Sequence, residues 1–230
     1  RNVLRVGIAG YGVVGKRRRH FIDQHQNLET IAVCDRKFED AGSLEDGVRF
    51  YPDYQSLLGE NLDVLFICMT NDIAPEVTIA GLRRDLHVFC EKPMAVDAPG
   101  LRRVMASARK AKEQGTNLMS GFCWRYSMPE RGFYGEINDG ALGEIESLHS
   151  TYHSGPLGVR DRQDDWTDMD FQLRNWQHFN WLGGDHIVEQ ACHAVDKINW
   201  AMNNRTPARC YAVGGRLCRE GLESGDIYDH

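Results

Sequence analysis

The 230-residue sequence predicts an α/β fold, in which a doubly wound parallel sheet is followed by a second, incomplete α+β domain. Strand and helix patterns alternate from residue 4 to about residue 122, the order that covers both faces of a parallel sheet with helices. The apolar run 63–69 has no polar alternation, as expected for a strand buried on both sides. After Phe122 the alternation stops. We therefore predict domains over residues 1–122 and 123–230.

The elements of the first domain follow from apolar runs and helix start signals. Pro75 is tolerated in the first turn of one predicted helix, and Asp97 is an acidic N-cap for the next. Strands are expected over residues 4–9, 30–34, 47–51, 63–69, 86–90 and 117–122, and helices over 13–25, 52–58, 73–84 and 97–113.

The second domain is richer in glycine, tryptophan and histidine. We predict helices over 129–138 and 185–202, strands over 144–153 and 209–217, and a loop-like segment over 155–182. The strands near Leu148 and Tyr211 should pair with each other and leave an open edge, or pair across an oligomer interface. In the helix 185–202, a spacing of 100° per residue predicts an apolar core stripe formed by Ile187, Val188, Ala191, Val195, Ile198 and Met202.

A glycine motif follows the first predicted strand directly. Gly10-x-Gly12-x-x-Gly15 opens the first helix, and Asp35 ends the second strand, 20 residues after Gly15. The glycines permit a tight turn, a close approach of backbone to a pyrophosphate and close packing of helix on strand, while the acid accepts ribose hydroxyls. The alternative is a glycine turn that binds nothing. The order of all these parts favours a dinucleotide-binding Rossmann domain.

Asp35 would repel a 2′-phosphate, so the sequence favours NAD, and Arg36 beside it keeps NADP possible. A second chemical signal is Glu91-Lys92-Pro93 at the end of a parallel strand, where ligands of doubly wound sheets bind. A surface lysine in a turn is the alternative interpretation. The predicted cofactor contacts are Gly10, Tyr11, Gly12, Val13, Val14, Gly15, Asp35, Arg36, Thr70, Asn71, Glu91, Lys92 and Pro93.

The helix 185–202 carries a second polar cluster opposite its predicted apolar stripe. The residues on that face are His186, Glu189, His193, Asp196 and Trp200. A solvated face would favour lysine and glutamate, so this set indicates the wall of a polar pocket. Glu189 and His193 are four residues apart and could hydrogen-bond, which would favour and orient an imidazolium. For either histidine alone, a structural role is an equal alternative.

Composition excludes several classes of function. A net charge of −6 argues against nucleic-acid binding, and the basic cluster 16–20 is expected to be a solvated helix face with at most a minor role near phosphates. No apolar run could span a bilayer. Seven cysteines without a C-x-x-C pair favour a reducing cytoplasm and free thiols, and no metal site is expected. Because the sequence starts at Arg1, a removed leader remains an option.

These motifs resemble the glucose–fructose oxidoreductase and inositol dehydrogenase family (Gfo/Idh/MocA) over nearly the whole chain. The matching motifs are Gly10-x-Gly12-x-x-Gly15, Glu91-Lys92-Pro93, Gly121-Phe122-x-x-Arg125 and Gly183-Gly184-x-x-x-x-Glu189-x-x-x-His193-x-x-Asp196. The family usually has aspartate at the position of Glu189. Its members are also longer, so the chain is expected to be a fragment, an engineered form or an unusually short member, with homo-oligomers formed by the full-length protein.

The resemblance implies NAD(P)-dependent hydride transfer to or from a secondary alcohol of a sugar, sugar derivative or cyclitol. His193 would take the hydroxyl proton, Lys92 would hold the oxygen, and Glu189 would orient His193. Two alternatives stay open: a non-catalytic nucleotide-binding protein that acts as a sensor or structural subunit, and metal-dependent hydrolysis through His186, Glu189 and His193. The predicted substrate contacts are Arg125, Arg160, Trp166, Arg174, Trp176 and His186.

Overall fold

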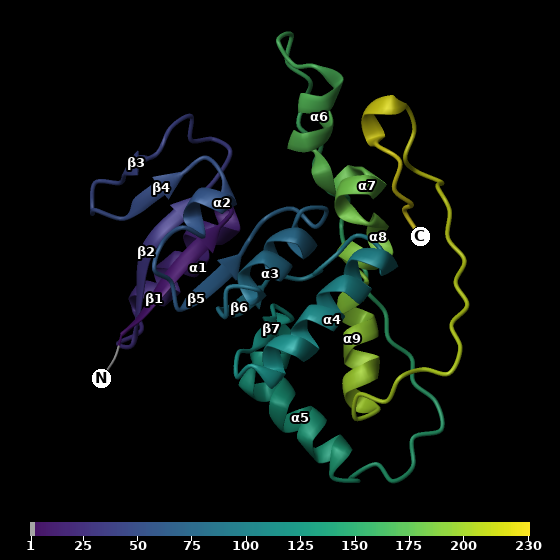
Figure 1. The fold of residues 1–230 in the computed structure, drawn as a ribbon. Coiled ribbons are helices and arrows are strands. Elements are labelled where there is room, and N and C mark those ends of the chain that lie inside the picture. The colour runs from purple at the N-terminus through teal and green to yellow at the C-terminus, as the bar shows by residue number, and fades with distance from the viewer. Residues whose placement is uncertain (1–2) are drawn as a thin grey trace. The chain divides into compact units, whose positions relative to one another are not determined.

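A computed structural model describes residues 3–230 of the chain (Figure 1). The chain divides into two compact units, residues 1–121 and 122–230. All five tryptophans of the sequence belong to the second unit.

The first unit is built on a seven-stranded sheet, counted over the described residues, with the order β3-β4-β2-β1-β5-β6-β7. All pairs of neighbouring strands are parallel except β3 with β4. The chain moves outward from β1 to β2 and β4 and then returns to β5 on the other side of β1, which creates a topological switch point. The predicted doubly wound sheet is confirmed. The strands are β1 (Leu4–Ala9), β2 (Leu28–Cys34), β3 (Gly42–Ser43), β4 (Arg49–Tyr51), β5 (Val64–Ile67), β6 (His87–Cys90) and β7 (Leu118–Ser120).

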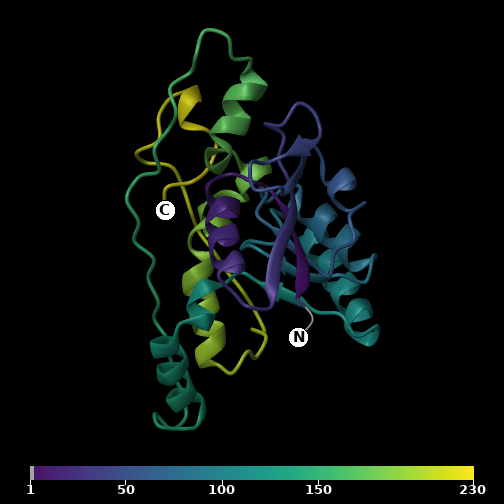
Figure 2. The same cartoon turned by 90° about the vertical axis from the view of Figure 1, so that its left-hand side faces the viewer.

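Helices cover both faces of this sheet, as Figures 1 and 2 show. They are α1 (Val13–Asp23), α2 (Tyr54–Leu57), α3 (Ala74–Leu82) and α4 (Ala98–Glu113). Side-chain caps fix two of the helix starts, because Asp53 accepts from the Ser56 N–H and Asp97 from the Gly100 N–H. The sequence did not predict β3, since a strand of two residues is too short to show periodicity.

The core of the first unit has one layer on each side of the sheet. On one side, Ile8 and Val33 pack with Ile22 of α1. On the other, Leu65 and Ile67 pack with α2, α3 and α4. Successive residues of β5 thus enter opposite layers, which explains why its sequence is continuously apolar.

The second unit contains helices joined by long irregular segments (Figure 1). The helices are α5 (Met128–Asn138), α6 (Asp168–Arg174), α7 (Asn180–Gly183), α8 (Asp185–Glu189) and α9 (Cys192–Ala201), with short 3₁₀ turns η1 (Cys123–Tyr126), η2 (Trp176–His178) and η3 (Leu222–Ser224). The helix expected over 129–138 is confirmed.

Two predicted strands of the second unit are wrong. Residues 144–153 and 209–217 form no strand and do not pair with each other, although Gly215 exchanges two backbone hydrogen bonds with Asp229 and His230. Leu148 is 43% exposed and Tyr211 is 89% exposed. Their alternating pattern supplies an apolar face, but a strand also needs a hydrogen-bonded neighbour, which the described residues do not provide.

The segment 155–182 is not the loop that was predicted, because it contains α6, η2 and α7. A capping box starts α6: Thr167 Oγ1 accepts from the Asp170 N–H, and Asp170 accepts from the Thr167 N–H. These helices are too short for their apolar spacing to be recognised, so the Thr167-x-x-Asp170 pair was their main sequence signal.

The long helix expected over 185–202 is interrupted at Gln190 and Ala191, between α8 and α9. The predicted apolar stripe is also wrong. Ile187 and Val195 are 55% and 47% exposed, whereas Glu189 and His193 are buried. The prediction assumed one continuous helix whose apolar side faces the core, but the helix breaks and the polar motif residues face inward.

Residues 225–230 fold back along η2, α7 and α8. The Asp226 N–H donates to the His178 carbonyl at 2.9 Å, and the Asp226 carboxylate accepts from the Asn180 N–H at 2.7 Å. Gly225 has a φ of +72°, and a Cβ atom there would lie 1.9 Å from the His178 carbonyl oxygen. Only glycine therefore allows this close approach, which buries Ile227.

The buried imidazole of His178 joins three segments of the second unit. Its Nδ1 accepts a hydrogen bond from Arg219 Nη1 at 2.9 Å, since a guanidinium can only donate, and its Nε2 therefore donates to the Gly158 carbonyl at 3.2 Å. This arrangement requires the neutral imidazole. Burial, and secondarily the charge of Arg219, lower the pKa of His178 below the usual 6.5.

The lowered pKa of His178 predicts that acid destabilises the second unit. Since the unfolded chain takes up this proton more readily, the stabilisation is fully present above pH 6.5 and is lost as the pH falls through the lower folded value. We expect the unfolding free energy to decrease by up to about 1.4 kcal/mol per pH unit in that range. Urea denaturation between pH 7.5 and 5 should show this slope in the wild type and in the control His153→Gln, and a reduced slope in His178→Gln. Equal slopes in all three proteins would contradict the assignment.

Candidate functional site

The glycine loop between β1 and α1 has a different steric requirement at each glycine. A Cβ atom on Gly10, where φ is +90°, would lie 2.4 Å from the Cys68 carbonyl oxygen, and one on Gly15 would lie 1.9 Å from the Gly10 carbonyl oxygen. A Cβ atom on Gly12 would meet nothing within 4 Å. Gly10 and Gly15 thus serve the turn and the packing of helix on strand, whereas Gly12 leaves open space at the start of α1.

A cavity of about 400 Å³ opens beside this loop at the carboxyl ends of the strands. It lies at the switch point between β1 and β5, where doubly wound sheets bind ligands. Five predicted cofactor residues line it: Gly10, Gly12, Asp35, Arg36 and Thr70. The other lining residues are Pro52, Asp53, Tyr54, Cys68, Met69, Asp72 and Ile73. None of these seven residues belongs to a recognised motif. They line the cavity because they lie in the segments that follow β4 and β5.

Asp35 fastens the glycine loop to the end of β2. Its Oδ2 accepts from the Tyr11 N–H at 2.8 Å, and its Oδ1 accepts from the Lys37 N–H at 3.1 Å. The Lys37 ammonium donates to the Tyr11 carbonyl and lies 4.9 Å from the centre of the Tyr11 ring. A carboxylate has about four acceptor positions, so Asp35 can hold the loop and still accept hydrogen bonds from hydroxyl groups in the cavity.

The basic cluster of α1 was predicted to be a solvated face, and for two of its members this is wrong. Arg19 donates to the Tyr11 hydroxyl at 2.8 Å and pairs with Asp23 and Asp46. Arg18 pairs with Glu91 at 2.5 Å and lies 5.5 Å from the centre of the Phe89 ring. Both arginines therefore tie α1 to neighbouring segments of the first unit.

Glu91-Lys92-Pro93 follows β6 and is packed tightly against the end of β7. A Cβ atom on Gly121 would lie 2.6 Å from Glu91 Oε2, which explains the glycine at that position. The Lys92–Pro93 peptide bond is cis, Pro93 is buried and Lys92 is half-buried. Among the other predicted cofactor residues, Asn71 is buried, and Val13 and Val14 at the start of α1 are 76% and 41% exposed.

The two motif residues of α8 and α9 are both buried in the second unit. His193 lies between two aromatic rings: it stacks with Tyr152 at 5.8 Å between ring centres and meets Phe122 edge-on at 6.0 Å. Glu189 is 6% exposed at the end of α8. The aromatic neighbours fix the plane of the imidazole.

Arg125 was predicted to contact substrate, but its guanidinium is committed to packing contacts. It pairs with both carboxylate oxygens of Asp196, at 2.8 and 2.9 Å, and donates to the Asn204 side chain at 2.7 Å. It also lies 5.2 Å from the centre of the Trp200 ring, which stacks on Tyr134. These contacts fasten η1 to α9.

The other predicted substrate residues separate into two groups. His186 lines a cavity, whereas Arg160, Trp166, Arg174 and Trp176 do not line that cavity. The Arg174 guanidinium lies 4.6 Å from the centre of the Trp166 ring. The Arg160 backbone is held by Asn175, whose side chain accepts from its N–H at 2.7 Å and donates to its carbonyl at 3.2 Å.

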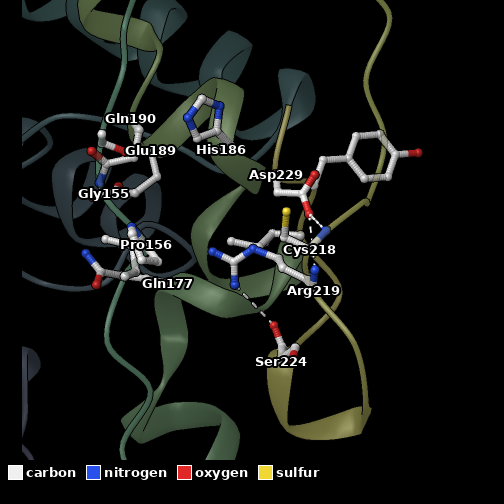
Figure 3. A pocket seen from close by; sticks show the side chains of 14 residues that line it. Gly155, Pro156, Gln177, His186, Glu189, Gln190, Cys218, Arg219, Ser224 and Asp229 are labelled. Atoms are coloured by element: carbon white, nitrogen blue, oxygen red, sulfur yellow. Dashed lines mark hydrogen bonds between the residues drawn. The ribbon is translucent and has the colours of Figure 1, made fainter.

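The cavity beside His186 has a volume of about 490 Å³ and belongs wholly to the second unit (Figure 3). Glu189 and Gln190 line it from α8 and the residue after it, Gln177 from η2, and Arg219 from the C-terminal segment. The remaining lining residues are Ser154, Gly155, Pro156, Leu157, Cys218, Ser224, Ile227, Tyr228 and Asp229. Sequence analysis missed Gln177, Gln190 and Arg219, since none belongs to a spaced motif.

Metal-dependent hydrolysis lacks a ligand set in the described residues. Within residues 3–230, no three His, Cys, Asp or Glu side chains are grouped so that they could hold a metal ion. The break between α8 and α9 removes the helical register that was expected to align His186, Glu189 and His193.

All seven cysteines are free thiols, and burial raises the pKa of Cys34 to about 12 and that of Cys90 to about 11.

In the part of the chain that the structure describes, no helix has the length and apolar character needed to cross a membrane.

The contrast between the glycines predicts two different mutant phenotypes. Gly12→Ala should keep wild-type stability, since its Cβ meets no atom, but should weaken NADH binding by at least about tenfold, because backbone can no longer approach the pyrophosphate. Gly15→Ala should lower the unfolding free energy by about 1–3 kcal/mol through overpacking. Urea denaturation and NADH fluorescence titration measure the two effects. Gly132→Ala, at another open position, is the control. Tight NADH binding by Gly12→Ala would contradict the role of that glycine.

Comparison with known proteins gives a consistent result. The model of the oxidoreductase family with an NAD-binding Rossmann fold, Gfo/Idh/MocA, matches residues 4–122. Inositol 2-dehydrogenase of Salmonella paratyphi B is 28% identical over 206 residues, which are 87% of this chain and 55% of that protein. D-glucoside 3-dehydrogenase of Escherichia coli is 32% identical over 147 residues, which are 62% of this chain and 41% of that protein.

Solved structures share the fold at lower identity. Myo-inositol 2-dehydrogenase from Lactobacillus plantarum is 22% identical, with a TM-score of 0.66 over 87% of this chain and 56% of that one. Scyllo-inositol dehydrogenase from Lactobacillus casei, with bound NAD(H) and scyllo-inositol, is 18% identical with the same TM-score and coverage. The chain thus spans about half the length of these relatives. The resemblance seen in the motifs is confirmed: the chain belongs to the Gfo/Idh/MocA oxidoreductase family, whose members have an NAD-binding Rossmann fold.

Proposed function

We propose that the chain binds NAD and transfers a hydride between it and a secondary alcohol carbon of a cyclitol, a sugar or a sugar derivative. The observation that carries this proposal is the cavity at the switch point, which both the open position at Gly12 and Asp35 line. The names of the relatives support the substrate class, since they include inositol 2-dehydrogenases and a glucoside 3-dehydrogenase.

The residues of the first unit fit a dinucleotide. The N–H groups and the dipole at the start of α1 would bind the pyrophosphate beside Gly12, and Asp35 would accept the hydroxyls of the adenosine ribose. Thr70 and Arg36 line the same cavity. When bound there, NAD supplies the hydride acceptor for alcohol oxidation and the hydride donor for the reverse reaction.

The proton would be handled by residues of Glu-Lys-Pro and of α8 and α9. His193 would take the hydroxyl proton, and its ring lies between those of Tyr152 and Phe122. We propose that Glu189 orients it as well. Lys92 would stabilise the developing alkoxide with its ammonium group. The Arg18–Glu91 ion pair holds the segment that carries Lys92 against α1. Glu189 replaces the aspartate usual in the family and would reach the imidazole with a longer side chain.

Two further properties belong to the proposal. The free thiols are consistent with a reducing cytoplasm, and the family resemblance implies a homo-oligomer in the full-length protein.

A screen of sugars and inositols for NADH formation, followed by absorbance, tests the reaction directly. A protein that binds NADH but oxidises none of these compounds would favour the non-catalytic alternative.

Replacement of the proposed proton-handling residues predicts a loss of turnover without a loss of cofactor. Lys92→Ala and His193→Ala should each reduce turnover by about 10²- to 10⁴-fold, because each removes a group that acts on the reacting oxygen. The NADH dissociation constant should change little. Steady-state kinetics and fluorescence titration measure these values, with Lys112→Ala and His149→Ala, both at exposed positions, as controls. Near-normal turnover in both test variants would end this mechanism.

Asp35 should set the choice of cofactor. Its carboxylate accepts ribose hydroxyls and repels a 2′-phosphate, so the wild type should bind NADH more tightly than NADPH. Asp35→Ala should weaken NADH binding by about tenfold or more and reduce the difference in affinity between NADH and NADPH. Calorimetric titration with both cofactors checks the prediction, and Asp40→Ala, at an exposed position, controls for the lost charge. A wild type that prefers NADPH would show that Arg36 outweighs Asp35.

A further inference from the structure

We propose that the 490 Å³ cavity of the second unit recognises an anionic sugar, with Arg219 binding its carboxylate or phosphate group. This inference deepens the proposed function, on which it rests, by naming the charge of the substrate. The cavity belongs to the second unit alone, so the inference is tested by binding as well as by turnover.

The guanidinium of Arg219 is fixed in place but lacks an anionic partner. Its Nη1 donates to His178 Nδ1 at 2.9 Å. It also donates to the Ser224 carbonyl at 3.4 Å (Figure 3). Its Nε is buried and has no hydrogen-bond partner. Within the described chain, no carboxylate forms an ion pair with it. A guanidinium that lines a concave site without an anionic partner favours the binding of an anion there.

The Asp229 carboxylate is ionised, but it binds backbone N–H groups and forms no ion pair with the Arg219 guanidinium. The Asp229 carboxylate accepts from the Leu217, Cys218 and Arg219 N–H groups at 2.7 to 3.2 Å, and these bonds hold the pKa of Asp229 well below its usual range. His178 is held neutral by its two hydrogen bonds and its lowered pKa. The positive end of the cavity is therefore Arg219, and the geometry of its planar fork suits carboxylate and phosphate oxygens.

The rest of the cavity suits the uncharged part of a sugar. Gln177, Gln190 and His186 line the cavity with groups that can hydrogen-bond to hydroxyls, and Glu189 lines it from α8. Pro156, Leu157 and Ile227 add apolar surface for C–H groups. The volume lies within the range of small-molecule sites. The lining thus fits one anionic group at Arg219 and hydroxyls toward α8.

Binding of defined sugars to the whole chain tests this assignment. The probes are D-glucuronate for a carboxylate, D-glucose 6-phosphate for a phosphate, and D-glucose and myo-inositol as neutral compounds, each titrated by calorimetry with and without NADH. The proteins are the wild type, Arg219→Gln, Arg219→Lys and the control Arg209→Gln, which removes the same charge from an exposed position. Urea denaturation of each variant verifies that it is folded.

At least one anionic sugar should bind the wild type more tightly than both neutral compounds. Arg219→Gln should weaken that binding by about 10- to 100-fold, as expected for a lost charge-assisted bond. Arg219→Lys should retain part of the affinity, and NADH binding should be unchanged. Neutral sugars that bind as tightly as the anionic ones, or an Arg219→Gln protein that loses no more affinity than Arg209→Gln, would overturn the inference. Turnover of a neutral sugar in those cases would leave the proposed function intact, whereas failure to bind NADH would refute the proposed function without affecting the sugar titration.

Discussion

The first unit depends on one backbone contact, the approach of Gly15 to the carbonyl of Gly10. There is no room for a Cβ atom at this point, so α1 packs directly on the end of β1. This contact fixes the direction of α1 and therefore the positions of the arginine side chains along the helix. Arg19 then reaches Tyr11, and Arg18 reaches Glu91. The nucleotide cavity and the Glu-Lys-Pro segment are thus both positioned by a helix whose placement requires a glycine.

The second unit is organised by a different principle, because the described residues there form no sheet. Polar side chains bind backbone groups of distant segments where a strand ladder would otherwise do so. Asn175 holds both backbone groups of Arg160, Asp226 caps the start of α7, and Asp229 gathers three consecutive N–H groups. Each of these single side chains forms several hydrogen bonds to backbone groups. The stability of the second unit is therefore sensitive to single substitutions at these positions.

The sequence predicted the first unit well because its signals are local. Strand β5 is continuously apolar, and Asp97 caps α4 as expected. Prediction from the sequence failed in the second unit, where contacts between residues far apart in the sequence determine the structure. The break at Gln190 turned Glu189 and His193 inward, and nothing near Leu148 or Tyr211 announced the lack of a partner strand. Arg219 gave no signal at all, since its importance arises from His178, 41 residues away. The catalytic roles of Lys92, His193 and Glu189 stay predictions.

The distribution of tryptophan makes the two units optically distinct. All five indole rings belong to the second unit, so the first unit emits only through its tyrosines and phenylalanines. Intrinsic tryptophan emission therefore reports on the environment of the helices and irregular segments of residues 122–230. Circular dichroism in the far ultraviolet follows both units. A comparison of the two signals in one denaturation series separates cooperative from independent unfolding of the units without any introduced label.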